Sequence, residues 1–254
     1  MTRILYSDLH RILKGRTVKA GMALIFGYTL FLTLFLKLVL YSIDAKLTSD
    51  DVLTAFPESA PFFIAASVLY IFLGDFSNGT IRNKIMCGVQ KKTVAASAII
   101  LGSLVSVFFV IFSQVSGMLL AKVFTDGYET MTATEIGEFC LRNIIASSAA
   151  GSFITMILMV LGGTKLAYVA GLVITFFFRI ATAEVLDKLY PESGTCLLEG
   201  TKLKLYTLYD QYCPYAHFTG LNYHDLTKCL IGCIILTAIS LLTGMIVYEK
   251  REFK

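Results

Sequence analysis

Six long apolar segments restrict this chain to a membrane-spanning fold. Each extends over roughly 18–27 residues, which is the length that an α-helix needs to cross about 30 Å of hydrocarbon. Only helices or closed barrels span lipid, because the bilayer interior offers no hydrogen-bond partner to an open backbone. The segments are Ala20–Ile43, Ser59–Phe76, Val94–Leu120, Asn143–Gly163, Leu166–Leu186 and Lys228–Tyr248. The sequence therefore predicts an all-α, polytopic membrane protein with six transmembrane helices.

The composition of the whole chain agrees with this assignment. Of 254 residues, 56% are hydrophobic and 16% are charged, and the mean hydropathy is +0.72. Soluble domains average about 25% charged residues. Since no internal repeat, low-complexity tract or linker divides the chain, we expect residues 1–254 to form a single transmembrane domain.

The distribution of charge predicts the orientation of the helices. Cytoplasmic loops of membrane proteins carry an excess of Lys and Arg. If the N-terminus lies inside, most basic residues fall into cytoplasmic segments, and the acidic residues of 44–58 and 126–138 fall outside. We therefore expect a multi-pass protein of the plasma membrane with both termini in the cytoplasm.

Residues 1–19 predict an interfacial helix before the first span. Its apolar residues recur at helical spacing and are Ile4, Leu5, Leu9, Ile12 and Leu13. They lie opposite Asp8, Arg11 and Lys14, which is typical of an amphipathic helix in the headgroup region. A cleaved signal peptide is the alternative, but the apolar run exceeds a signal core of about 7–15 residues and no A-x-A-like site follows it.

Sequence motifs of catalysis are absent. The chain has no complete phosphate-binding loop, no H-E-x-x-H zinc motif and no G-x-S-x-G nucleophile motif. Its three histidines, His10, His217 and His224, lie outside the predicted spans, which argues against a haem or histidine metal site in the membrane. The glycosylation sequon at Asn78 lies on the predicted cytoplasmic side, so we attribute it to chance. We expect neither enzymatic activity nor a cofactor in this chain.

The loop 77–93, between the second and third spans, carries the most informative motif. The acidic residue Asp75 precedes Gly79-Thr80, and the basic residues Arg82 and Lys84 follow. Together with the amphipathic N-terminus, the six spans and the charged C-terminus 248–254, this order resembles the ABC-2 type transporter permeases, the membrane subunits of ABC exporters. It most resembles their small peptide-export and immunity branch. That family more usually has glutamate where this chain has Asp75, which leaves the charge unchanged.

The resemblance implies that transport and ATP hydrolysis lie on different chains. Two copies of a cytosolic ABC ATPase would bind ATP and Mg²⁺, and this chain would pair with a second permease subunit as a homodimer. The loop 77–93 would be the coupling helix, contacting the ATPase. The coupling residues would be Asp75, Gly79, Thr80, Ile81, Arg82, Asn83 and Lys84. The alternative is a solvated basic turn that only satisfies the positive-inside rule.

A substrate pathway is expected along the second and fifth spans. Its aromatic candidates are Phe62, Phe63, Tyr70 and Phe177, for which ordinary packing or lipid contact is the alternative. Arg179 lies within the fifth span, where a charge is costly unless it faces protein or water. It could line the pathway or pair with an acidic residue such as Glu184, and the alternative is that it extends to the outer interface.

The segment 187–227 is the largest element expected outside the membrane. Its tyrosines suit an interfacial aromatic belt, and in the resembled family short re-entrant helices lie here. Cys196 and Cys213 share the segment. A disulfide between them would stabilise the protein by roughly 3 kcal/mol in an oxidising compartment. Alternatively, the cysteines serve as small apolar residues.

Two functions follow from these observations. The first is the permease subunit of an ATP-driven ABC exporter that moves an amphipathic peptide or another hydrophobic, antimicrobial substrate outward. The second is a non-transporting membrane regulator or assembly scaffold that docks a cytosolic partner through its basic loop. An ATPase whose hydrolysis depends on this chain would favour the first.

Overall fold

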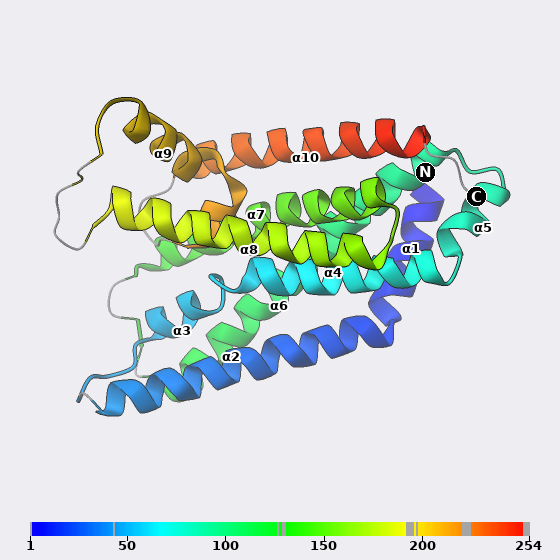
Figure 1. Ribbon diagram of the computed structural model, residues 1–254. Coiled ribbons are helices and arrows are strands. Elements are labelled where there is room, and N and C mark those ends of the chain that lie inside the picture. Colours follow the sequence, from blue (N-terminus) through cyan, green and yellow to red (C-terminus); the bar gives the residue numbers. More distant parts are fainter. Residues whose placement is uncertain are drawn as a thin grey trace.

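The computed structural model describes residues 2–42, 44–125, 127–128, 131–191, 196, 198–219 and 225–250. Within these residues every regular element is a helix, which confirms the predicted all-α class (Figure 1). The elements are α1 (Thr2–Lys14), α2 (Arg16–Ser42), α3 (Ser49–Ala55), α4 (Ala60–Ser77), α5 (Thr80–Met86), α6 (Lys91–Phe124), α7 (Ala133–Leu161), α8 (Lys165–Leu189), α9 (Gly200–Tyr212), the 3-10 helix η1 (Pro214–Phe218) and α10 (Leu226–Glu249).

Six helical segments of the described chain are long and apolar enough to cross a membrane, as predicted. They correspond to α2, α4 with the preceding α3, α6, α7, α8 and α10. These helices form a bundle, with α1 and α5 at one end and α3 and α9 toward the other (Figure 1). The start of α1 and the end of α10 lie at the same end as α5, as an even number of crossings requires.

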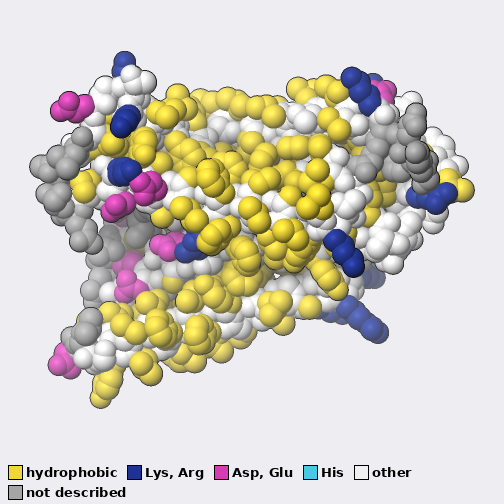
Figure 2. All heavy atoms as spheres, viewed as in Figure 1, with side chains coloured by type: hydrophobic (Ala, Val, Ile, Leu, Met, Phe, Trp, Pro, Cys, Tyr) yellow, Lys and Arg dark blue, Asp and Glu magenta, His cyan; other side chains and the backbone are white. Residues whose placement is uncertain are grey.

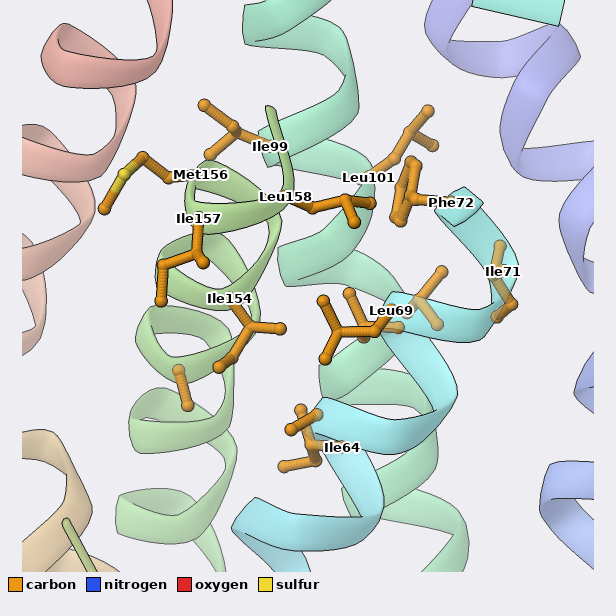
Figure 3. Packing of buried hydrophobic residues seen from close by; sticks show 14 of the residues in the cluster. Ile64, Leu69, Ile71, Phe72, Ile99, Leu101, Ile154, Met156, Ile157 and Leu158 are labelled. Carbon is orange, nitrogen blue, oxygen red and sulfur yellow. The ribbon is translucent and has the colours of Figure 1, made fainter. Parts of the chain in front are cut away.

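The helices α6 and α7 form the centre of the bundle. In their most apolar stretches 67% of the residues are buried, against 17% in α2 and 22% in both α8 and α10. Leu101 of α6, Leu158 of α7 and Phe72 of α4 point toward one another in this core (Figure 3). The face shown in Figure 2 is largely hydrophobic over α2, α8 and α10. Soluble monomers seldom expose such a surface, so it is suited to contact with lipid.

The contact between α6 and α7 depends on small residues. The Cβ of an alanine at Gly102 would lie 1.9 Å from Thr155 Oγ1, and one at Gly151 would lie 2.0 Å from Ser106 Oγ. The two hydroxyls donate to carbonyl oxygens of their own helices, at 2.8 Å for Thr155 and 2.7 Å for Ser106. Small residues allow the backbones to approach closely, which drives helix association in lipid.

The fourth span begins earlier than predicted. We expected it to start at Asn143, but α7 starts at Ala133. The Thr132 hydroxyl accepts from the backbone N–H of Glu135, and the Glu135 carboxylate accepts from the backbone N–H of Thr132 at 2.7 Å, which forms a capping box. Hydropathy misses this start because the first turns of α7 are polar.

Candidate functional site

The loop between α4 and α6 contains the short helix α5 (Thr80–Met86). Gly79 precedes α5 with a φ of +69°, a left-handed conformation that glycine adopts without strain. Gly88 follows with a φ of +86°. The Gly88 N–H donates to the Ile85 carbonyl at 3.0 Å and the Val89 N–H donates to the Lys84 carbonyl at 3.1 Å, a common helix C-terminal motif. Two glycines therefore fix where α5 begins and ends.

The two faces of α5 have different surroundings. Ile81 is buried in the main hydrophobic core. Among the predicted coupling residues, Gly79, Thr80 and Lys84 are half-buried. Arg82 and Asn83 are exposed, so these two predicted coupling residues are accessible to a partner. Met86 is also exposed on α5, and sequence reasoning missed it because an exposed methionine carries no motif.

Asp75, in the last turn of α4, binds α1. Its two carboxylate oxygens accept hydrogen bonds from Nη1 and Nη2 of Arg11, each at 2.6 Å. Asp75 is only 6% exposed. Bidentate, charge-assisted pairs of this kind are among the strongest side-chain interactions. The hydrogen bond to Asp75 also raises the pKa of Arg11, so the guanidinium stays charged.

Asp8, one turn before Arg11 on α1, binds α5. Its carboxylate accepts a short hydrogen bond from Lys84 Nζ, and its Oδ1 lies 3.8 Å from Arg11 Nη2. Asp8 is 5% exposed, and its basic partners compensate for its removal from water. Asp8, Arg11, Asp75 and Lys84 therefore form one charge network, which connects α1, the end of α4 and α5.

The bundle covers the apolar face of α1. We expected Asp8 on the polar face, opposite the apolar residues. Instead, Asp8 is buried beside α5, while Leu5, Leu9 and Ile12 pack against the core of the bundle. The amphipathic pattern of α1 is confirmed, but protein covers its apolar face. Helical spacing alone does not reveal which surface covers an amphipathic helix.

A cavity of about 640 Å³ opens beside the charge network. Arg11, Asp75 and Asn78 line its polar side. Tyr70 of α4 and Lys165, the first residue of α8, line it as well. We call this cavity the Tyr70 cavity. It lies where α1, α4 and the turn before α8 meet, at the α5 end of the bundle.

A second cavity, of about 330 Å³, lies at the other end of α4. Phe62 and Phe63 of α4 line it together with Tyr28 of α2 and Arg179 of α8, and we call it the Arg179 cavity. Residues of α2, α4 and α8 line both cavities. Figure 2 shows basic and acidic side chains meeting between the surfaces of α8 and α2 on this side.

Arg179 does not pair with Glu184. Its Nη1 donates to the carbonyl oxygen of Glu58 at 2.7 Å and lies 3.3 Å from Ser59 Oγ. Glu184 instead forms an ion pair with Lys188 on the next turn of α8. Positions i and i+4 of a helix face the same side, whereas i and i+5 do not. The spacing of the two charges therefore ruled out the expected pair.

The predicted pathway residues occupy three different places. Phe62, Phe63 and Arg179 share the Arg179 cavity, and Tyr70 lies in the Tyr70 cavity. Phe177 lines neither cavity and is exposed on the surface of α8. The first four residues therefore lie along one side of the bundle, and Phe177 has the surroundings of a lipid-contacting residue.

The helices α9 and η1 close the end of the bundle opposite α5. Every residue of η1 is buried, and the Tyr215 ring stacks on Phe178 of α8 with 4.6 Å between the ring centres. His217 is buried, and its Nε2 lies 3.1 Å from the carbonyl oxygen of Gln211. The predicted outside segment is thus partly inserted into the bundle. Residues 192–195, 197 and 220–224 of that segment lie outside the described residues.

Cys196 and Cys213 are not joined in the structure. Both thiols are free, and Cys196 Sγ donates to the carbonyl oxygen of Lys188 at 3.4 Å. Burial raises the pKa of the Cys213 thiol, which favours the neutral form. Cys213 therefore behaves as the small apolar residue of the alternative interpretation.

Asp210 of α9 is a buried carboxyl at this end of the protein. It accepts a hydrogen bond from Tyr190 Oη at 3.1 Å. Burial raises the pKa of Asp210, although Tyr190 and His217 act in the opposite direction. Because the folded protein then binds the proton more tightly than the unfolded chain, the free energy of unfolding falls as pH rises from the unfolded-state pKa through the folded-state pKa.

Asp210→Asn is expected to flatten this pH dependence, because the amide does not titrate. Thermal unfolding in detergent between roughly pH 4 and 7, around the ordinary carboxyl pKa, would measure it. Glu199→Gln, an exposed carboxyl just before α9, is the matched control and should keep the wild-type slope. Parallel pH profiles for wild type and Asp210→Asn would contradict the assignment.

No family model matches this chain, and no curated protein matches it. Among the described residues, no group of three or more His, Cys, Asp or Glu is placed to hold a metal ion. The charge network and the two cavities therefore carry the functional assignment.

Proposed function

We propose that this chain is the membrane subunit of an ATP-driven exporter of the ABC-2 type. The observation that carries this proposal is the charge network at α5. It joins α1 to the end of α4 through Arg11 and Asp75, and it joins α5 to α1 through Lys84 and Asp8. The exposed side of α5 remains accessible to a partner, so a force applied there reaches a membrane helix directly.

The partner in this proposal is a cytosolic ABC ATPase. The α5 end carries basic residues, as cytoplasmic ends do, and the start of α1 and the end of α10 lie at the same end (Figures 1 and 2). This supports a plasma-membrane protein with both termini in the cytoplasm. ATP and Mg²⁺ would bind the ATPase, and its motion would shift the helices between inward- and outward-facing arrangements.

A second permease subunit belongs to the proposal. Two ATPase copies need two docking helices, and each chain offers one α5, which favours a homodimer. The Tyr70 and Arg179 cavities lie toward opposite ends of α4, and the proposed substrate path runs between them. A substrate on that path meets both apolar and polar groups, which suits an amphipathic peptide or another hydrophobic, antimicrobial compound.

A charge reversal on α5 tests the docking. Arg82→Glu should lower the stimulation of the partner ATPase by this chain at least tenfold, because Arg82 is exposed on the docking face. Lys19→Glu reverses an exposed charge at the same end, outside α5, and should leave the stimulation unchanged. Both are measured as ATP hydrolysis by the ATPase reconstituted with the full chain in vesicles.

The alternative is a static scaffold that docks the same partner without transport. ATPase binding without any stimulation by the wild-type chain would favour that scaffold. Equal stimulation by wild type and Arg82→Glu would remove α5 as the contact.

A further inference from the structure

Three side chains from three helices meet at the mouth of the Arg179 cavity. Arg179 of α8 reaches the residues just before α4, with Nη1 at 2.7 Å from the Glu58 carbonyl oxygen and 3.3 Å from Ser59 Oγ. Ser59 Oγ lies 2.9 Å from Tyr28 Oη of α2, and either hydroxyl can donate. These contacts hold the guanidinium in place although its side chain is exposed.

The Arg179 guanidinium has hydrogen-bond donors that its described contacts do not use. An arginine side chain carries five N–H donors in a planar fork. Both described hydrogen bonds of Arg179 leave from Nη1, so the N–H groups of Nη2 and Nε remain for a ligand. A planar fork of this kind matches the oxygens of a phosphate.

Arg179 lies in the half of the membrane distant from α5. It lies 14 residues beyond Lys165, the first residue of α8, which is about 21 Å along the helix at 1.5 Å per residue. Its contacts with Glu58 and Ser59 put the charge level with the start of α4. In a hydrocarbon layer of about 30 Å that α8 enters at Lys165, this is past the midplane and about 9 Å short of the boundary distant from α5. A charged side chain at that depth needs a polar or anionic partner, or extends toward the interface.

Aromatic rings line much of the cavity. Phe63 and the exposed rings of Phe62 and Phe176 line it beside Arg179. A ligand that fills it needs a charged group at the mouth and apolar chains next to these rings.

We propose that the Arg179 cavity binds the phosphate group of an anionic amphiphile, with the apolar chains of that ligand against Phe62 and Phe176. As an assignment of substrate class this rests on the proposed function, whereas the binding itself does not. Glu58 also lines the cavity and is exposed. Its carboxylate repels an anionic phosphate and therefore weakens the binding of this ligand. Neutralising Arg179 should therefore weaken the binding of the anionic amphiphile, whereas neutralising Glu58 should not.

The test uses short lipids as probes. Dihexanoyl phosphatidylglycerol is titrated onto the purified full chain in a neutral detergent, and bound lipid is counted by native mass spectrometry. Dihexanoyl phosphatidylcholine and glycerol phosphate are measured as the zwitterionic and headgroup-only probes. Arg179→Gln should weaken binding of the phosphatidylglycerol at least tenfold, Arg179→Lys should weaken it less, and Glu58→Gln should leave it equal or tighter.

Lys37→Gln is the matched control. Lys37 of α2 is another exposed cation near the same end, and its Nζ donates to the Phe124 carbonyl oxygen at 3.3 Å, but it lines no described cavity. An equal loss of binding in Lys37→Gln and Arg179→Gln would overturn the proposal, because general surface charge would then explain both. Equal binding of both lipids would also overturn it, and so would equal binding by glycerol phosphate, since the acyl chains would then contribute nothing.

The binding test is independent of the ATPase. If the wild-type chain binds the phosphatidylglycerol as expected but does not stimulate the ATPase, the proposed function is rejected and the site is kept. If the wild-type chain stimulates the ATPase but does not bind the phosphatidylglycerol, the site is rejected and the proposed function is kept.

Discussion

Asp75→Asn is expected to cost this protein about 2 kcal/mol of stability and to release α1 from the end of α4. The amide keeps one of the two acceptors and loses the charge, so Arg11 loses its counter-ion. Removing one partner of a fully buried ion pair costs about 3–5 kcal/mol. We expect less here because 46% of the Arg11 side chain is exposed. Thermal unfolding and hydrogen exchange of residues 2–14 measure the two effects.

Two further variants separate this effect from a general loss of charge. Glu249→Gln removes the 3.0 Å ion pair with Lys92 at the same end, but both side chains are about half exposed, so stability should change by less than about 1 kcal/mol. The double variant Arg11→Gln/Asp75→Asn removes both charges and should be more stable than Asp75→Asn alone. Equal losses in Glu249→Gln and Asp75→Asn would contradict a special role for the charge network.

The same variant has a functional consequence under the proposed function. Asp75→Asn leaves the exposed residues of α5 unchanged, so the ATPase should still bind and hydrolyse ATP. Transport should fall at least tenfold, because α1, which binds α5 through Asp8 and Lys84, is no longer bound to the end of α4. Arg82→Glu should instead lower hydrolysis itself, so the two variants distinguish docking from transmission.

The membrane-spanning helices could be predicted because lipid imposes a simple rule. Each apolar segment had to form a helix of sufficient length, and the spans lie where that rule placed them. Their ends follow different physics. The start of α7 depends on the reciprocal hydrogen bonds of Thr132 and Glu135, which hydropathy ignores. Local polar chemistry therefore shifted the boundary while the helix itself was predicted correctly.

The pairing of charges could not be predicted in the same way. Asp75 was singled out, but its partner Arg11 lies 64 positions earlier, and Lys84 lies 76 positions after Asp8. Such partners are fixed by how α1 and α5 pack, and no local pattern encodes that packing. Arg179 was singled out because a charge within a membrane span needs an explanation. Its hydrogen bond goes to the backbone carbonyl of Glu58, and a pattern of side chains does not predict such a contact.

Gly102→Ala is expected to lower the free energy of unfolding by about 3 kcal/mol, at the upper end of about 1–3 kcal/mol for overpacking a core. The new Cβ would lie 1.9 Å from Thr155 Oγ1 and 2.9 Å from Thr155 Cβ. Either Thr155 leaves its hydrogen bond to the Gly151 carbonyl, or α6 and α7 move apart. Gly117→Ala on the same helix is the control, because nothing lies within 4 Å of its Cβ. It should be neutral or stabilising, since alanine favours helix.

The double variant Gly102→Ala/Thr155→Ala identifies the cause of that loss. Removing Oγ1 takes away the closest contact, but the Cβ at position 155 stays 2.9 Å from the new methyl group and the Gly151 carbonyl stays at 3.1 Å. We therefore expect about half of the lost stability to return, measured by thermal unfolding in the same detergent. Full recovery would mean that the hydroxyl alone sets the distance between α6 and α7. No recovery would mean that the two backbones do, because the remaining contacts lie close to the helix axes.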